Sequence, residues 1–211
     1  MRPVTCMITD RRRLARQGED AILASIAAAA AAGVDLVQVR ERDLGGAALL
    51  RLTRGAFASV RGTPTRVLVN DRVDVALAAA AHGVHLRGDS VPAARVRAIA
   101  PRGFLVGRSI HGAADAARAW RDGGVDLLVF GHVYRSPSKP GLEPAGIERL
   151  RQVVAATPIP VLALGGITAE RFDEVAATGA AGFAAIGLFA DAGSGAMREM
   201  LAAAQAAFDR R

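Results

Sequence analysis

The sequence of 211 residues predicts an α/β fold, a closed (β/α)8 barrel of parallel strands known as the TIM barrel. Eight short apolar runs of strand-like pattern recur along the chain. Helical segments fill the gaps, and strands that alternate with helices imply a parallel sheet with right-handed crossovers. Eight such units in a chain of this length indicate a closed barrel. No segment resembles a linker, so we expect one domain over residues 1–211.

The predicted strands fall into two alternating groups. Four follow a glycine that ends a helix and lie at 34–40, 82–86, 123–130 and 181–186. The other four follow a proline and lie at 4–8, 67–69, 104–106 and 161–164. Helices are expected at 20–32, 74–81, 113–121, 144–156, 169–178 and 197–208, among others. The count is eight strands and about eight helices.

An open doubly wound sheet is the alternative fold. It would need a glycine-rich phosphate loop after the first strand. Thr9, Asp10 and Arg11 follow that strand without a glycine, which favours the barrel.

Composition limits the classes of function. Half of the residues are apolar, at 51%, but only 4% are aromatic, so the core is expected to consist of small aliphatic side chains. The apolar run at 24–32 is much shorter than the roughly 18 to 20 residues that span a bilayer, so no membrane partner is expected. The N-terminal residues lack the regions of a signal peptide, which predicts a cytoplasmic protein. Cys6 lies in the first apolar run and is expected to be a buried structural thiol.

The net charge of +7 favours anionic partners. The arginines are spread along the chain without interleaved aromatic residues, so we expect no nucleic acid and favour phosphorylated small molecules. Lys139 is the single lysine among 27 basic residues. Its ammonium group differs chemically from a guanidinium, although an arginine-rich composition could leave one lysine by chance.

Polar residues follow most of the predicted strands. The active site of such a barrel is built at the carboxyl ends of its strands. The second to sixth strands end in Gln38, Arg40, Glu41 and Arg42; Asn70 and Asp71; His85, Arg87 and Asp89; Arg108, Ser109 and His111; and His132, Ser136, Ser138 and Lys139.

Glycines mark the last two exits. Gly165 and Gly166 follow the seventh strand, and Ile186 and Gly187 end the eighth. Glycines let backbone amides approach an anion, and a phosphate site after strands seven and eight recurs in this architecture. The alternative is that these glycines serve only the turns.

Some of the polar positions could serve more than one purpose. Arg40 suits a phosphate or carboxylate but could instead pair with Glu41 or Asp71 in a structural network. Asn70 and Asp71 could hold Mg²⁺, with Asp89 as the nearest further carboxylate. His132 is a candidate for proton transfer or a core histidine whose hydrogen bonds are satisfied.

Five motifs, taken together, resemble the thiamin-phosphate synthase superfamily over nearly the whole chain. They lie at 38–42 (QVRER), 69–74 (VNDRVD), 83–86 (GVHL), 107–111 (GRSIH) and 163–167 (ALGGI). The superfamily has two branches, the synthase and a thiazole tautomerase of the TenI type. After the sixth strand the chain has His132 where synthases generally have proline, and Ser90 stands where they carry a magnesium-binding aspartate. Both departures favour the tautomerase branch.

The resemblance then implies an isomerase of thiamin biosynthesis that aromatises a carboxythiazole phosphate. His132 would be the acid and base, and the reaction would need no metal or other cofactor. The protein would be a homodimer that binds a phosphorylated thiazole. The substrate-binding residues implied by resemblance and position are Gln38, Arg40, Asn70, Ser109, Lys139, Gly165, Gly166, Ile186 and Gly187.

Two other functions stay open. In the synthase, which joins hydroxymethylpyrimidine diphosphate to thiazole phosphate with release of pyrophosphate, Asn70, Asp71, Mg²⁺ and Lys139 would hold the diphosphate. A binding protein that has lost catalysis is the third possibility, and the nearly complete set of polar exits argues against it.

Overall fold

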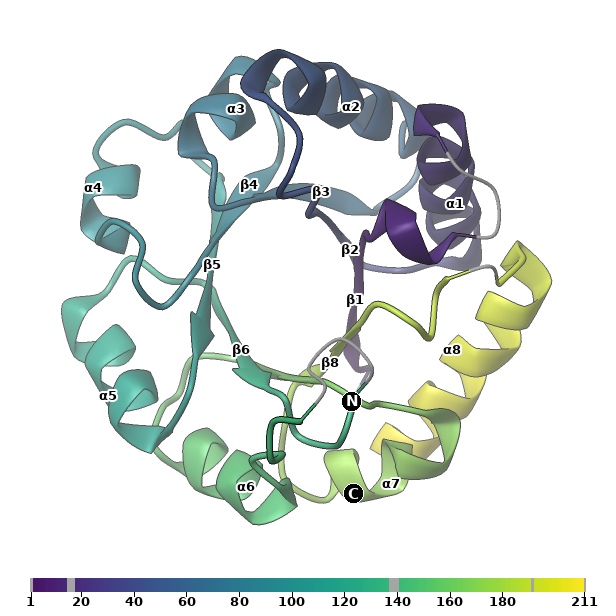
Figure 1. The fold of residues 1–211 in the computed structure, drawn as a ribbon. Helices are drawn as coiled ribbons and strands as arrows, with labels where there is room; N and C mark the ends of the chain where they lie inside the picture. The colour runs from purple at the N-terminus through teal and green to yellow at the C-terminus, as the bar shows by residue number, and fades with distance from the viewer. Residues whose placement is uncertain (1, 15–17, 137–140, 191, 211) are drawn as a thin grey trace.

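The computed structural model describes residues 2–14, 18–136, 141–190 and 192–210. Within these residues, parallel strands pair in chain order, and β8 pairs with β1 to close the barrel. Figure 1 looks into this ring of strands and shows the helices around its outside. The predicted fold class is confirmed. None of the described helices is long and apolar enough to cross a membrane.

The strands are short and lie close to their predicted positions. They are β1 (Val4–Ile8), β2 (Leu36–Val39), β3 (Arg66–Asn70), β4 (Gly83–Leu86), β5 (Leu105–Ile110), β6 (Leu127–Gly131), β7 (Val161–Leu164) and β8 (Gly182–Ala185). Two boundaries matter for function. β2 ends before Arg40, and β5 continues past the predicted 104–106, so that Ser109 lies on the strand.

The helices form the outer layer. They are α1 (Glu19–Ala32), α2 (Gly46–Ser59), α3 (Val73–Ala78), α4 (Ala93–Arg97), α5 (Ala113–Asp122), α6 (Ile147–Ala155), α7 (Phe172–Ala176) and α8 (Ser194–Asp209), with 3-10 turns η1 (Arg11–Arg13) and η2 (Ala169–Arg171). α1 has Glu19 and Asp20 in its first turn and ends at Gly33, whose φ of 97° is left-handed. These are the start and stop signals that predicted it.

The strands separate two apolar clusters. The outer cluster, between strands and helices, contains alanine, valine and the buried phenylalanines. The inner cluster fills the barrel and consists of Cys6, Ile8, Leu36, Leu68, Leu127, Val129, Leu162 and Ala184. Cys6 is a buried free thiol, and burial raises its pKa to about 12.

Candidate functional site

Inward-facing residues change from apolar to polar at the carboxyl ends of β2 to β5. Side chains alternate along a strand, so Leu36 and Gln38 share one face of β2, as Leu68 and Asn70 share one face of β3. Leu36 and Leu68 belong to the inner cluster. The residues that follow them on this face therefore form the top of the barrel interior, above the inner cluster.

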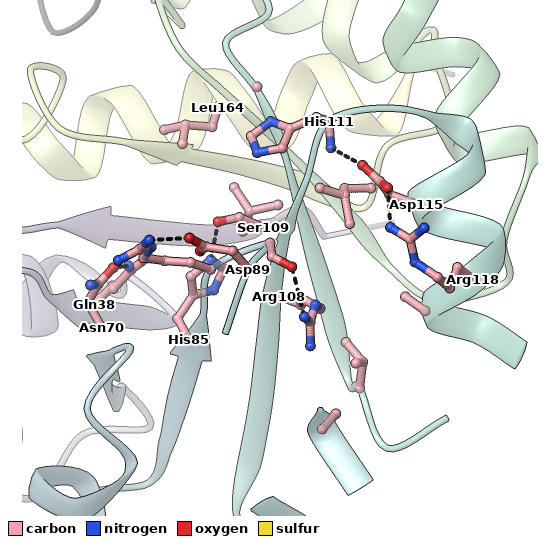
Figure 2. A pocket seen from close by; sticks show the side chains of 18 of the residues that line it. Gln38, Asn70, His85, Asp89, Arg108, Ser109, His111, Asp115, Arg118 and Leu164 are labelled. Atoms are coloured by element: carbon pink, nitrogen blue, oxygen red, sulfur yellow. Dashed lines mark hydrogen bonds and ion pairs between the residues drawn. The ribbon is translucent and has the colours of Figure 1, made fainter. Parts of the chain in front are cut away.

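Four polar side chains form an arc across these strands. Gln38 Nε2 donates a hydrogen bond to Asn70 Oδ1 over 2.8 Å, and His85 Nε2 lies 2.8 Å from Ser109 Oγ. Figure 2 shows both pairs beside each other. Three of the four, Gln38, Asn70 and Ser109, are predicted site residues that the barrel brings together.

His85 is a neutral imidazole in this arc. Only 3% of the residue is exposed, and burial lowers its pKa to about 4, against a smaller opposite effect of the Asp71 charge. One ring nitrogen of a neutral imidazole donates and the other accepts. His85 thus fixes the Ser109 hydroxyl by a hydrogen bond that does not change between about pH 6 and 8.

A cavity of about 720 Å³ opens above the arc. Its lining includes all four arc residues, together with the ends of β6 and β7 at Gly131 and Leu164. Many of its other side chains are cations, and the arginines that line it are Arg40, Arg42, Arg87, Arg108 and Arg118. Asp89, Asp115 and Asp122 also line the cavity, so the arginines exceed the carboxylates and the concave surface favours anionic substrates.

Arg40 does not form the ion pairs with Glu41 or Asp71 that a structural network would use, and its role in binding stays a prediction. Burial, followed by the neighbouring charge of Arg42, lowers the pKa of Arg40. Glu41 pairs with Arg11 at 3.1 Å, and Asp71 pairs with Arg87 at 3.5 Å. Among the described residues no carboxylate forms an ion pair with the Arg40 guanidinium, which therefore remains available to an anion.

The surroundings of Asp71 do not fit a bound magnesium ion. One carboxylate oxygen accepts a hydrogen bond from the Ser90 hydroxyl, and the other lies 3.5 Å from Arg87 Nη1. Arg87 Nη2 also donates to Asp89 over 2.5 Å and so lowers the pKa of that carboxyl. Within the described ranges no group of three His, Cys, Asp or Glu side chains could hold a metal ion. The Arg87 guanidinium thus contacts both carboxylates that could have shared a metal ion, Asp71 and Asp89.

Arg108 shapes the loop between β4 and α4. Its guanidinium donates to the backbone carbonyls of Gly88, Ser90 and Val91 at 2.9, 3.3 and 3.3 Å. Three carbonyls held by one side chain fix the path of this loop. Arg87 and Asp89 are therefore presented to the cavity from an ordered backbone.

The glycines after β7 are packed against the loop that follows β6. The amide of Val133 donates to the Leu164 carbonyl and the amide of Tyr134 to the Gly165 carbonyl, at 2.8 and 3.0 Å. A Cβ at Gly165 would lie 2.3 Å from His132 Cβ, and φ is 100°. A side chain at this position has neither the space nor the backbone conformation it needs.

Gly166 is held from a second direction. Arg171 Nη1 donates to the Gly166 carbonyl over 2.5 Å, and the Arg171 guanidinium lies 4.1 Å from the centre of the Tyr134 ring. The Tyr134 hydroxyl donates to Glu174 over 2.5 Å, and the pKa of Tyr134 is raised by burial and by that carboxylate. This cluster orients the peptide groups of the predicted phosphate loop.

The predicted phosphate residues lie beside the cavity. Leu164 lines it, whereas Gly165, Gly166, Ile186 and Gly187 are not among its lining residues. β7 and β8 pair in parallel, so their exits are neighbours as the sequence predicts. Their role as a phosphate site stays a prediction.

His132 does not line the cavity. Its Nε2 lies 3.3 Å from the Leu142 carbonyl, only 8% of the residue is exposed, and it is not among the lining residues. Lys139 lies outside the described residues.

Several charged or polar residues of the cavity lie outside the predicted set. His111, Asp115 and Arg118 form one linked group, in which the His111 amide and the Arg118 guanidinium both donate to Asp115 (Figure 2). Arg87 is another. Arg87 and His111 stand at strand exits in the sequence, so position gives a signal for them. Arg118 lies on α5, and no motif marks it.

Comparisons with known proteins agree with one another. The family model described as "Thiamine monophosphate synthase" matches residues 5–189. A relative named "Putative thiamine-phosphate synthase" from Geobacter sulfurreducens is 45% identical over 181 residues, which cover 85% of this chain and 83% of the relative. A thiamine-phosphate synthase of Methanoculleus marisnigri is 36% identical over 184 residues, with 84% and 87% covered.

The solved structures give the same result. A thiamine phosphate pyrophosphorylase from Pyrococcus furiosus has a TM-score of 0.83 at 29% identity and covers 98% of this chain and 97% of its own. A 4-hydroxy-2-oxoglutarate aldolase with a TM-score of 0.65 at 21% identity, covering 97% of this chain and 94% of its own, shares the fold alone.

These similarities correct the prediction of a thiazole tautomerase, which is wrong. That prediction depends on two single positions, His132 and Ser90, whereas the relatives that match most of the chain are named as synthases. The structure supplies a physical reason for His132, since its ring contacts the Leu142 carbonyl and does not line the cavity. The acid and base role assigned to His132 belongs to the isomerase reaction and is not carried forward.

Proposed function

The chain belongs to the thiamine monophosphate synthase family, and on that premise we propose that it is a transferase that makes thiamin phosphate. Its substrates would be hydroxymethylpyrimidine diphosphate and thiazole phosphate, and its products thiamin phosphate and pyrophosphate. The observation that carries this proposal is the arginine-lined cavity above the arc of Gln38, Asn70, His85 and Ser109.

The two sets of groups in the cavity suit the two ends of the pyrimidine substrate. Side-chain amides of Gln38 and Asn70 and the Ser109 hydroxyl offer donors and acceptors to ring nitrogens and an amino group. Arg40 and Arg42 offer guanidinium groups to a diphosphate. Ring recognition and anion binding thus occur side by side.

The reaction transfers the pyrimidine methylene group from an oxygen of the diphosphate to the thiazole ring nitrogen. The carbon–oxygen bond breaks, its electron pair leaves on pyrophosphate, and the nitrogen lone pair forms the new bond. Negative charge on the leaving group therefore increases in the transition state. Fixed cations at that position lower the barrier because they stabilise the transition state more than the bound substrate.

The second substrate would bind at the neighbouring exits. Its phosphate would contact backbone amides of the loops at Gly166 and Gly187. The hydrogen bond from Arg171 to the Gly166 carbonyl supports this assignment, because it fixes the orientation of the peptide groups in this loop. No step in this proposal passes through a metal ion.

The test is an assay of the purified chain with both substrates. We expect thiamin phosphate and pyrophosphate in equal amounts, and no product when either substrate is omitted. Gln38→Ala should raise the KM for the pyrimidine substrate about tenfold, the equivalent of about 1.4 kcal/mol. Arg149→Gln, an exposed position on α6, is the control. The proposal would be refuted if no thiamin phosphate formed either in the presence or in the absence of magnesium.

A further inference from the structure

We propose that Arg87 supplies in this chain the positive charge that a metal ion would bring to the diphosphate, so that pyrophosphate binds without a resident divalent metal. The proposal rests on the transferase function proposed above. Its observations are the contacts of Asp71, Arg87, Asp89 and Ser90, called here the β4 cluster.

Ser90 has a role in the β4 cluster that an aspartate could not fill. Its hydroxyl accepts a hydrogen bond from the Arg87 amide at 2.8 Å and donates one to the Asp71 carboxylate. An ionised carboxylate only accepts hydrogen bonds and would repel Asp71. The loop is therefore built around one carboxylate and a hydroxyl at this point, and not around two carboxylates.

Arg87 compensates the acidic charge that remains. Its guanidinium contacts both Asp71, at 3.5 Å, and Asp89, at 2.5 Å. A guanidinium has five N–H donors, so two carboxylate contacts leave donors for a further anion. The side chain is 47% exposed and lines the cavity, so such an anion can reach it.

The position of Arg87 is fixed by its neighbours. Arg108 binds the carbonyls of Gly88, Ser90 and Val91, which holds the loop that carries Arg87. Asp71 is fixed as well, because its amide donates to the His85 carbonyl at 2.8 Å. An ordered guanidinium binds phosphate oxygens with less loss of side-chain entropy than a mobile one.

Competition between Arg87 and a metal gives the proposal a direct consequence. A divalent ion on Asp71 would lie beside the Arg87 cation and would have to displace it. Magnesium should therefore improve pyrophosphate binding little in the natural chain. It should improve binding much more when Arg87 is removed and an acid replaces Ser90.

The experiment titrates pyrophosphate calorimetrically into the purified chain, once with a chelator and once with magnesium. For the natural chain we expect binding in chelator and an affinity within about threefold of that in magnesium. Arg87→Met should weaken binding in chelator about tenfold or more, and Arg87→Lys by less. The double variant Arg87→Gly/Ser90→Asp should bind at least about tenfold more tightly with magnesium than with chelator.

Two results would overturn the proposal. One is pyrophosphate binding by the natural chain that requires magnesium, and the other is an unchanged affinity of Arg87→Met in chelator. Arg149→Gln serves as the matched arginine control, and thermal unfolding of each variant identifies a folding defect. If Arg87→Met does not fold, the affinity of Arg87→Lys for pyrophosphate in chelator is compared with that of the natural chain. A weaker affinity supports the proposal, and an unchanged affinity contradicts it. Pyrophosphate binding in chelator without any thiamin phosphate synthesis would refute the transferase and leave this inference intact.

Discussion

The two sides of the barrel opening present chemical groups of different kinds. At the ends of β2 to β5 the surface consists of side chains, in the form of the polar arc and the arginines of the cavity. At the ends of β7 and β8 it consists of glycine backbone, packed so closely at Gly165 that a Cβ has no space. The side-chain region can change its chemistry by single substitutions, and the backbone region cannot. A single unusual residue is therefore a weak guide to function when it lies near the backbone region.

The largest effect is expected from Gly165→Ala in the backbone region. Its Cβ would lie 2.3 Å from His132 Cβ at a φ of 100°, so clash and backbone strain add. Together they should lower the free energy of unfolding by roughly 4 kcal/mol. Urea unfolding measures this loss.

Gly62→Ala separates the two causes. Gly62 has a φ of 79°, and no atom lies within 4 Å of the place that a Cβ would take, so the alanine there carries only the backbone strain. We expect a loss of about 1 kcal/mol at this position. Equal losses at both positions would mean that Gly165 is not tightly packed.

His85 in the side-chain region is expected to give the next largest effect. Its folded-state pKa of about 4 lies below the ordinary value of 6.5, so the unfolded chain binds the extra proton as pH falls between these values. Stability from this group is complete above pH 6.5 and is lost toward pH 4, by up to about 3 kcal/mol.

The unfolding free energy of the natural chain and of His85→Asn, measured from about pH 7 to about pH 4, tests this. The asparagine does not titrate, so its curve should fall less steeply, while the shared loss from other groups cancels in the difference. Parallel curves would show that His85 is not buried as a neutral ring.

Arg40→Gln should affect substrate binding more than folding. Arg40 has no ion-pair partner among the described residues, so its removal breaks no structural contact of that kind. We expect kcat/KM for the pyrimidine diphosphate to fall about 30-fold, the equivalent of about 2 kcal/mol. Steady-state kinetics measure it, and an unchanged kcat/KM would contradict the assignment of the side-chain region to the diphosphate.

His132→Asn should give the smallest effect on catalysis. The His132 ring contacts the Leu142 carbonyl and does not line the cavity. We expect kcat for thiamin phosphate formation to stay within about threefold of the natural chain, or about 0.7 kcal/mol. A loss of about a hundredfold would return His132 to the reacting groups and would break the distinction between the two regions.

Local patterns in the chain were enough to predict the barrel and most of the positions at its opening. Strand and helix patterns depend on neighbouring residues, so eight alternating units could be recognised without the fold. The same patterns placed Gln38, Asn70 and Ser109 at strand ends, and the structure brings these three residues together in one arc. Arg118, which lies on α5 and not at a strand exit, carried no such signal.

Which of these residues meet, and where their side chains point, depends on tertiary packing. The Gln38–Asn70 hydrogen bond joins residues 32 positions apart. The Arg87–Asp71 ion pair and the contact of His132 with the Leu142 carbonyl likewise follow from how the strands and loops of the closed barrel pack. The type of a loop residue determines which chemistry its side chain can perform. Contacts with distant segments determine whether that side chain can face a ligand, because they fix its backbone and its rotamer.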